Sequence, residues 1–196
     1  MSNTRNMLIE VARQLFADKG KKVVTMNDIA EASKKGRRTL YTYFKNKEEI
    51  YKAVIDRELD TILEKLILVS TQKTEPDIKL KKLILAHLDA VKNVVNRNGS
   101  LRADFFHDIY EVERKRRKID VKEIAIIRSI ISEGIEKNIF KKMDLELSSI
   151  IIFYAIKGLE VPYIRQNISA EFEINKKSIV DFVFMGIKKK ESRLIR

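Results

Sequence analysis

Cationic and aromatic side chains crowd into one stretch of the chain, K-K-G-R-R-T-L-Y-T-Y-F-K-N-K-E-E-I, residues 34–50. A solvated helix uses the cations but has little need of the rings, and a core helix uses the rings but not the cations. A short helix that packs one face and binds phosphates with the other uses both. The stretch therefore predicts contact with a polyanion.

The order of side chains within this stretch fits insertion of a short helix into a DNA major groove. Arg37 and Arg38 stand at its start, and an arginine can pair with guanine through two hydrogen bonds. Leu40 and Phe44 lie one turn apart and are expected to face the core. Four hydroxyl groups are expected to bond phosphates or bases: those of Thr39, Tyr41, Thr42 and Tyr43.

The charge of the chain is concentrated at the same end. The formal net charge is +12 over 196 residues. Residues 1–47 hold 11 lysines and arginines against 4 acidic residues, so this quarter of the chain carries +7 of the surplus. An uneven basic surplus of this kind is typical of proteins that bind nucleic acid.

Several function classes are excluded or disfavoured. The chain has no cysteine, which rules out disulfides and cysteine-built metal centres, and it has no paired-histidine metal motif around His87 or His107. Nucleotide-binding and nucleophile-elbow motifs are missing, so an enzyme is not expected, nor a cofactor or a metal. Without a signal peptide or a long apolar run, we expect a cytoplasmic protein that does not enter a membrane.

Helical periodicity predicts the elements that position the basic stretch. A first helix carries Leu8 and Phe16 and ends at Gly20. Thr25 is the expected N-cap of a second, with Asp28 in its first turn. The short helix of residues 37–44 follows. Asn46 is the expected cap of a fourth helix, of about residues 46–70.

The rest of the sequence also predicts helices, and the fold class is all-α. One helix follows Pro76 and ends near Gly99. A helix through 105–109 is expected to end in the charged run 111–118, and a separate helix covers 124–135. The segment 144–164 is apolar nearly all round in its middle, and a last helix lies around 175–190.

The stretch T-M-N-D-I-A-E-A-S-K-K-G-R-R-T-L-Y-T-Y-F-K-N-K-E-E-I resembles the N-terminal domain of TetR-type transcriptional regulators, over roughly residues 7–51. The resemblance implies a helix-turn-helix DNA-binding domain, residues 1–47, joined by the fourth helix to a helical regulatory and dimerisation domain, residues 48–196. It implies a homodimer on double-stranded DNA with a palindromic operator. The implied DNA contacts are Thr25, Asn27, Gly36, Arg37, Arg38, Thr39, Tyr41, Thr42, Tyr43 and Lys47.

The turn before the short helix departs from the family pattern. A small residue, a glycine and an apolar residue are usual there, and this chain has Ser33, Lys34 and Lys35. Lys34 is therefore expected in a left-handed conformation that costs strain. Gly36 replaces the usual serine or threonine cap, so its own contact with DNA can involve only the backbone.

The C-terminal helices suggest two further sites. By analogy with the family, a cavity for a small apolar or amphipathic ligand is expected among aromatic side chains, while core packing is the alternative for the same set: Phe105, Phe106, Tyr110, Phe153 and Tyr154. The last two apolar helices have more apolar faces than one core needs, which predicts a four-helix dimer interface formed by Ile151, Ile152, Leu159, Phe182, Val183 and Ile187.

Two functions agree with these features. The first is a dimeric DNA-binding regulator, a repressor released from its operator by a small ligand in the C-terminal domain. The alternative is a DNA-bound dimer that recruits a protein partner and has no small-molecule inducer. Only a real ligand cavity separates the two, and the sequence does not reveal one.

Overall fold

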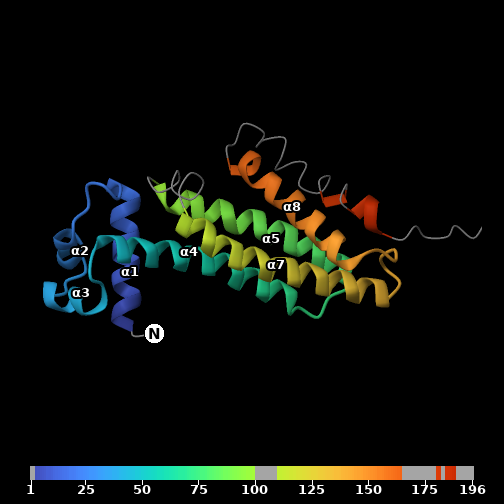
Figure 1. Cartoon of the computed structure of the whole chain (residues 1–196), viewed down its shortest axis with the longest axis horizontal. Helices are drawn as coiled ribbons and strands as arrows, with labels where there is room; N and C mark the ends of the chain where they lie inside the picture. Colours follow the sequence, from blue (N-terminus) through green and yellow to red (C-terminus); the bar gives the residue numbers. More distant parts are fainter. Residues whose placement is uncertain (1–2, 100–109, 165–179, 182–183, 189–196) are drawn as a thin grey trace, which may run out of the picture. The chain divides into compact units, whose positions relative to one another are not determined.

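The fold is built from helices, as predicted. The computed structural model describes residues 3–99, 110–164, 180–181 and 184–188, with the side chains of all of these except 110–115 and 161–164. This part of the chain contains an isolated bridge between Phe140 and Lys188 and no strand. In chain order the helices are α1 (Asn3–Lys19), α2 (Met26–Ala32), α3 (Arg37–Tyr43), α4 (Lys47–Ser70), α5 (Pro76–Arg97), α7 (Tyr110–Glu136) and α8 (Leu145–Ile164) (Figure 1).

The chain divides into two compact units. The first consists of Met1–Thr61 and Asn93–Lys118, and the second of Ile62–Lys92 and Ile119–Arg196. Helices α4, α5 and α7 each contribute residues to both units. These units reflect packing within the chain, and the predicted functional boundary after residue 47 stays a prediction.

The core of the first unit is formed by α1, α2, α3 and the start of α4. The ring of Phe16 lies edge-on to Tyr51, with 6.0 Å between the ring centroids. Leu40 and Phe44 are buried, as the sequence predicted. Among residues 3–61, the apolar residues that are at most 1% exposed are Leu8, Ala12, Phe16, Val24, Ile29, Leu40, Phe44, Ile50 and Val54.

The core of the second unit is formed by α5, α7, α8 and the end of α4, which contributes the fully buried Leu66. Its apolar side chains recur at helical spacing, so each helix buries one stripe. Examples at most 2% exposed are Leu80, Leu83, Ile84, Leu88, Ile127, Ile131, Phe153 and Ile156. Within the described residues no helix combines the length and apolar character that a membrane crossing requires.

Three ionisable side chains are buried inside this second core. Nδ1 of His87 on α5 lies 2.7 Å from Glu123 on α7, and Nε2 lies 3.0 Å from Glu160 on α8. Burial alone would lower the pKa of His87, but the two carboxylates together outweigh it and raise that pKa to about 9. The imidazole is therefore positively charged at neutral pH and links three helices.

Helix α7 differs from the prediction. The charged run 111–118 was expected to end one helix, with another covering 124–135. Instead α7 is continuous from Tyr110 to Glu136. No glycine or proline interrupts residues 110–133, and Glu, Lys and Arg are good helix formers, so the polar run continues the helix. The helices predicted around 105–109 and 175–190 lie wholly or largely outside the described residues.

Candidate DNA-binding site

The start of α2 is fixed by a capping box around Thr25. The Thr25 hydroxyl accepts from the Asp28 backbone N–H at 3.2 Å, and the Asp28 carboxylate accepts from the Thr25 backbone N–H at 2.7 Å. The same hydroxyl donates to Asp28 Oδ2 at 2.8 Å, and these bonds lower the pKa of Asp28. A phosphate contact from Thr25 would therefore require its hydroxyl to turn away from Asp28.

The turn between α2 and α3 confirms the predicted left-handed conformation of Lys34. Lys34 has φ of 53°, a left-handed conformation. Its N–H donates to the Glu31 carbonyl at 3.0 Å, and the Lys35 N–H donates to the Ala30 carbonyl at 3.1 Å. This pair of bonds is a Schellman motif, in which the left-handed position is usually glycine. The motif ends α2 sharply and places two lysines beside the next helix.

Helix α3 has one packed face and one solvent face. Leu40 is fully buried, and Phe44, directly after the helix, is 1% exposed. Arg37, Arg38, Tyr41 and Thr42 are exposed, while Thr39 and Tyr43 are half-buried. The separation of cations and hydroxyls from the packed residues matches the expectation from the sequence.

The two tyrosines of α3 are placed differently. Tyr41 has 47% of its surface exposed and lies on the solvent face, while Tyr43 is half-buried. Thr42 is exposed, and its hydroxyl donates to the Arg38 carbonyl within the helix at 2.9 Å. Tyr41 therefore has the better-placed hydroxyl for a ligand outside the fold.

Lys47, the first residue of α4, is held by the turn between α1 and α2. Its Nζ donates to the carbonyls of Lys21 at 2.9 Å and Lys22 at 3.3 Å. An ammonium has three N–H donors, so a phosphate contact would add to these bonds rather than replace them. Asn46 caps α4 as predicted, accepting from the Glu49 N–H at 2.9 Å.

The electrostatics of this region favour an anion. Residues 32–47 contain six lysines and arginines and no acidic residue. Lys34, Lys35 and Lys45 are exposed, as are Arg37 and Arg38. A short helix with a cationic outer face and cationic residues before and after it can approach a groove lined by phosphates.

Comparison with known proteins agrees with this geometry. Residues 8–54 match the family described as bacterial regulatory proteins, tetR family, and the matched segment covers α2, α3 and most of α1. Residues 8–54 therefore form an N-terminal domain of the TetR type. The chain is a DNA-binding transcriptional regulator and not an enzyme.

Relatives extend the similarity beyond the N-terminal helices. The uncharacterised regulator YhgD of Bacillus subtilis is 26% identical over 153 residues, which cover 76% of this chain and 78% of YhgD. A transcriptional regulator from Cytophaga hutchinsonii aligns with a TM-score of 0.79 at 21% identity, over 96% of this chain and 100% of its own. FadR of Bacillus subtilis, solved with stearoyl-CoA, aligns with a TM-score of 0.68 at 20% identity, over 92% of this chain and 98% of FadR.

The residues predicted to line a ligand cavity are only partly described. Phe105 and Phe106 lie outside the described residues, and so does the side chain of Tyr110. Phe153 is 1% exposed, whereas its neighbour Tyr154 is 63% exposed. The two rings meet edge-on, with 5.2 Å between their centroids, but only Phe153 is buried in the core.

The residues predicted to form a dimer interface also differ in how exposed they are. Ile151 is 58% exposed and Ile152 is 4% exposed. Leu159 and Ile187 are half-buried, and Phe182 and Val183 lie outside the described residues. The exposed apolar face of α8 consists of Leu147, Ile151 and Tyr154, at i, i+4 and i+7.

Proposed function

We propose that this regulator is a homodimeric repressor of the TetR family that leaves a palindromic operator when a small apolar or amphipathic ligand binds its C-terminal helices. The observation that carries the proposal is the division of α3 into two faces. Leu40 is buried, whereas Arg37, Arg38 and Tyr41 are exposed. Residues 1–47 would contact the operator, and residues 48–196 would bind the ligand and form the dimer. DNA contact is proposed for the ten residues named from the family resemblance.

Dimerisation through α8 is supported by its exposed apolar face. Leu147 and Ile151 are each 58% exposed and Tyr154 is 63% exposed, which is costly for side chains of this size on one helical stripe. Ile152 is buried in the core of its own subunit. The proposed interface is therefore centred on Ile151, and Ile152 does not contribute to it equally. A twofold axis would place this face against its own copy.

The fold shared with FadR supports an amphipathic ligand, because that protein was solved with stearoyl-CoA. A ligand of this class would act by linkage. Two recognition helices must meet half-sites about 34–36 Å apart, one turn of DNA. A ligand that prefers a dimer with a different spacing must weaken operator binding by the same factor by which the operator weakens ligand binding.

Selection of bound duplexes from a random library, with the full chain at physiological salt, tests the DNA part of the proposal. We expect enrichment of one palindrome. Binding that is sensitive to salt but enriches no sequence would contradict a specific regulator. Addition of stearoyl-CoA to the selected complex tests the ligand part: release supports an acyl-type inducer, and an unchanged complex counts against that class.

Arg37 provides the matched variant for this selection. If Arg37 reads a base, Arg37→Ala should weaken binding to the selected palindrome by about 1–3 kcal/mol and relax the selection at one position of each half-site. Equal weakening on every sequence would instead make Arg37 a phosphate contact. Lys45→Ala, which removes an exposed cation outside α3, is the control and should leave the selected sequence unchanged.

A further inference from the structure

A buried carboxylate joins α4 to the end of α5. Glu58 is fully buried, and Oε2 accepts from Arg97 Nε at 2.7 Å and from Asn98 Nδ2 at 2.7 Å. Arg97 Nη2 donates to Oε1, so the guanidinium binds Glu58 through two parallel bonds. A buried charge needs partners of this kind. They fix the last residue of α5 against α4.

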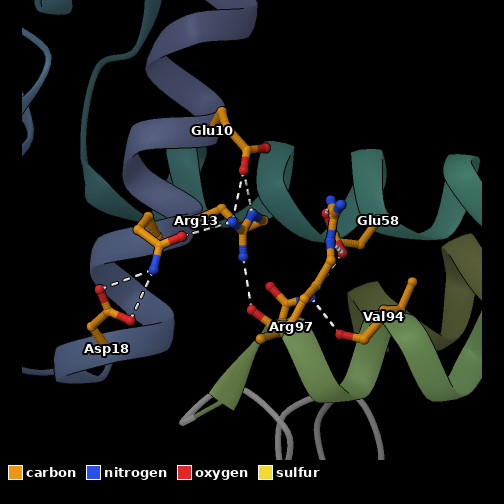
Figure 2. A network of polar contacts seen from close by, with 8 residues as sticks. Glu10, Arg13, Asp18, Glu58, Val94 and Arg97 are labelled. Carbon is orange, nitrogen blue, oxygen red and sulfur yellow. Dashed lines mark hydrogen bonds and ion pairs between the residues drawn. The ribbon is translucent and has the colours of Figure 1, made fainter.

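The backbone of the same arginine is bound to α1. Arg13 is 8% exposed, and its Nη1 donates to the Arg97 carbonyl at 2.8 Å (Figure 2). The Arg97 carbonyl is at the C-terminus of α5, where it has no partner within the helix and where the helix dipole favours a cation. Arg13 is oriented for this by Glu10, which accepts from Nε at 2.7 Å, and by Gln14, which accepts from Nη2 at 2.9 Å.

A third contact lies one turn further along α1. Gly99 has φ of 41°, and a β-carbon there would lie 2.7 Å from the Ala17 carbonyl oxygen. The chain after α5 therefore runs directly against the backbone of α1, closer than any side chain would permit. Arg13 and Ala17 are four residues apart, so the end of α5 docks on one face of α1.

Helix α1 is the element that carries the helix-turn-helix. It packs against α2, and it supplies the buried side chains Leu8, Ala12 and Phe16 to the core of the first unit. Helix α5 also has residues 76–92 in the second unit, with Leu83, Leu88 and His87 buried there. A shift of α5 along its axis must either carry α1 with it or break the bond from Arg13.

We propose that Arg13, Glu58 and Arg97 form a latch through which α5 transmits ligand binding to the DNA-binding helices. The three are positioning residues for DNA binding, since Arg13 and Glu58 are buried and none of the three is a proposed DNA contact. The proposal rests on the proposed function. It assigns the coupling to α5 and α1, in addition to the direct connection of α4 to α3.

Reciprocal coupling makes the latch testable without a known inducer, because operator binding must then affect α5. The probe is the duplex enriched in the library selection. Amide hydrogen exchange of the full chain, with and without this duplex, reports on residues 80–92 of α5. We expect the duplex to slow exchange there in the wild type, and Arg13→Met to abolish that slowing and weaken operator binding by about 2- to 30-fold.

Two further variants separate coupling from loss of stability. Arg13→Lys keeps a cation that can donate to the Arg97 carbonyl, and it should restore part of the effect on α5. Phe16→Leu destabilises the same helix by truncating a buried ring without touching the latch, and it should leave the effect on α5 intact.

The outcomes distinguish the latch from the function on which it rests. If operator binding does not change exchange in residues 80–92 of the wild type, or if Arg13→Met and Phe16→Leu behave alike, the latch is overturned while the repressor proposal stands. A chain that enriches no operator would overturn the proposed function, and the latch with it.

Discussion

At the residue scale, Lys34 occupies a position that suits glycine. Its φ of 53° brings the β-carbon close to the backbone, at a cost of roughly 1–2 kcal/mol. Lys34→Gly should remove this strain. Part of the gain is offset because glycine has more freedom in the unfolded chain, so we expect a net stabilisation of about 0.5–1 kcal/mol, measured by urea unfolding.

Lys34→Ala is the control, because it removes the charge but keeps the β-carbon. It should stay within about 0.5 kcal/mol of the wild type. Both variants lose the same cation, so both should lower the salt slope of operator binding by about one if Lys34 meets a phosphate. Equal stability of the two variants would show that the left-handed turn stores no strain.

Local signals explain why these features could be predicted from the sequence. Thr25 with Asp28, and Asn46 with Glu49, are pairs separated by three residues, so their bonds are set by the local backbone. The left-handed conformation of Lys34 could be predicted from its position in the turn that ends α2. The partner of Glu58 lies 39 residues away, and no local rule identifies it.

His87 is a second residue whose environment gives a testable result. Its pKa is 6.5 in an unperturbed chain and about 9 in the fold, because Glu123 and Glu160 outweigh the effect of burial. A raised pKa contributes stability that is complete below pH 6.5 and is lost as the pH rises through 9. The shift corresponds to on the order of 3 kcal/mol. Urea unfolding across this window should show the loss.

Glu160→Gln and His87→Gln serve as comparisons for this pH dependence. Glu160→Gln removes one of the two charges that hold the proton, so the loss of stability should begin at lower pH than in the wild type. His87→Gln has no proton to lose, so the decline between pH 6.5 and 9 should largely disappear. A His87→Gln curve parallel to that of the wild type would contradict the raised pKa.

At the element scale, helical periodicity predicted α1 to α5 and α8, but it divided α7 and did not show how charged residues are used within the helices. Glu58 has buried Val54 and Ile62 four residues away on either side, and His87 has Leu83 and Val91. Glu123 lies in the same way between Ile119 and Ile127. A charge in register with an apolar stripe is the signal that could have identified these buried groups. Their partners depend on how helices pack, which one sequence does not reveal.

The close packing at the end of α7 gives a prediction at this scale. A β-carbon on Gly134 would lie 2.1 Å from the ring of Phe140, which is 2% exposed. The ring is confined in the core, so Gly134→Ala should destabilise the fold by about 1–3 kcal/mol despite the better helix propensity of alanine. Thermal unfolding would measure this change.

A double variant tests the cause of that loss. Phe140→Leu replaces the ring with a smaller side chain and destabilises the fold on its own. If the clash with the ring is responsible, adding Gly134→Ala to Phe140→Leu should cost less than adding it to the wild type. Additive losses would show that the ring and the new methyl group do not compete for space.

At the scale of the whole molecule, the N-terminal surplus of charge and the exposed apolar face of α8 have complementary uses. The N-terminal charge surplus supplies affinity for phosphates, but the affinity of a single DNA-binding domain is modest. The second supplies a surface that one subunit leaves uncovered, with Leu147, Ile151 and Tyr154 exposed. If two copies join there, two recognition helices bind one operator, and the second binding event becomes intramolecular.

Ile151→Glu tests this connection between assembly and DNA binding. A carboxylate on the α8 face should be incompatible with an apolar interface, and sedimentation should show a monomer where the wild type is a dimer. The side chain is 58% exposed, so the fold itself should tolerate the change. The monomer should bind the full palindrome about 100-fold or more weakly, because each half-site is then bound alone.

Val121→Glu is the matched control, since Val121 is 68% exposed on α7, outside the proposed interface. It introduces the same charge and should leave both the dimer and the operator affinity unchanged. If Ile151→Glu stays dimeric and binds like the wild type, the α8 interface is wrong. If it becomes a monomer but keeps full affinity, the operator does not require two recognition helices, and the ligand could not act by changing the distance between them.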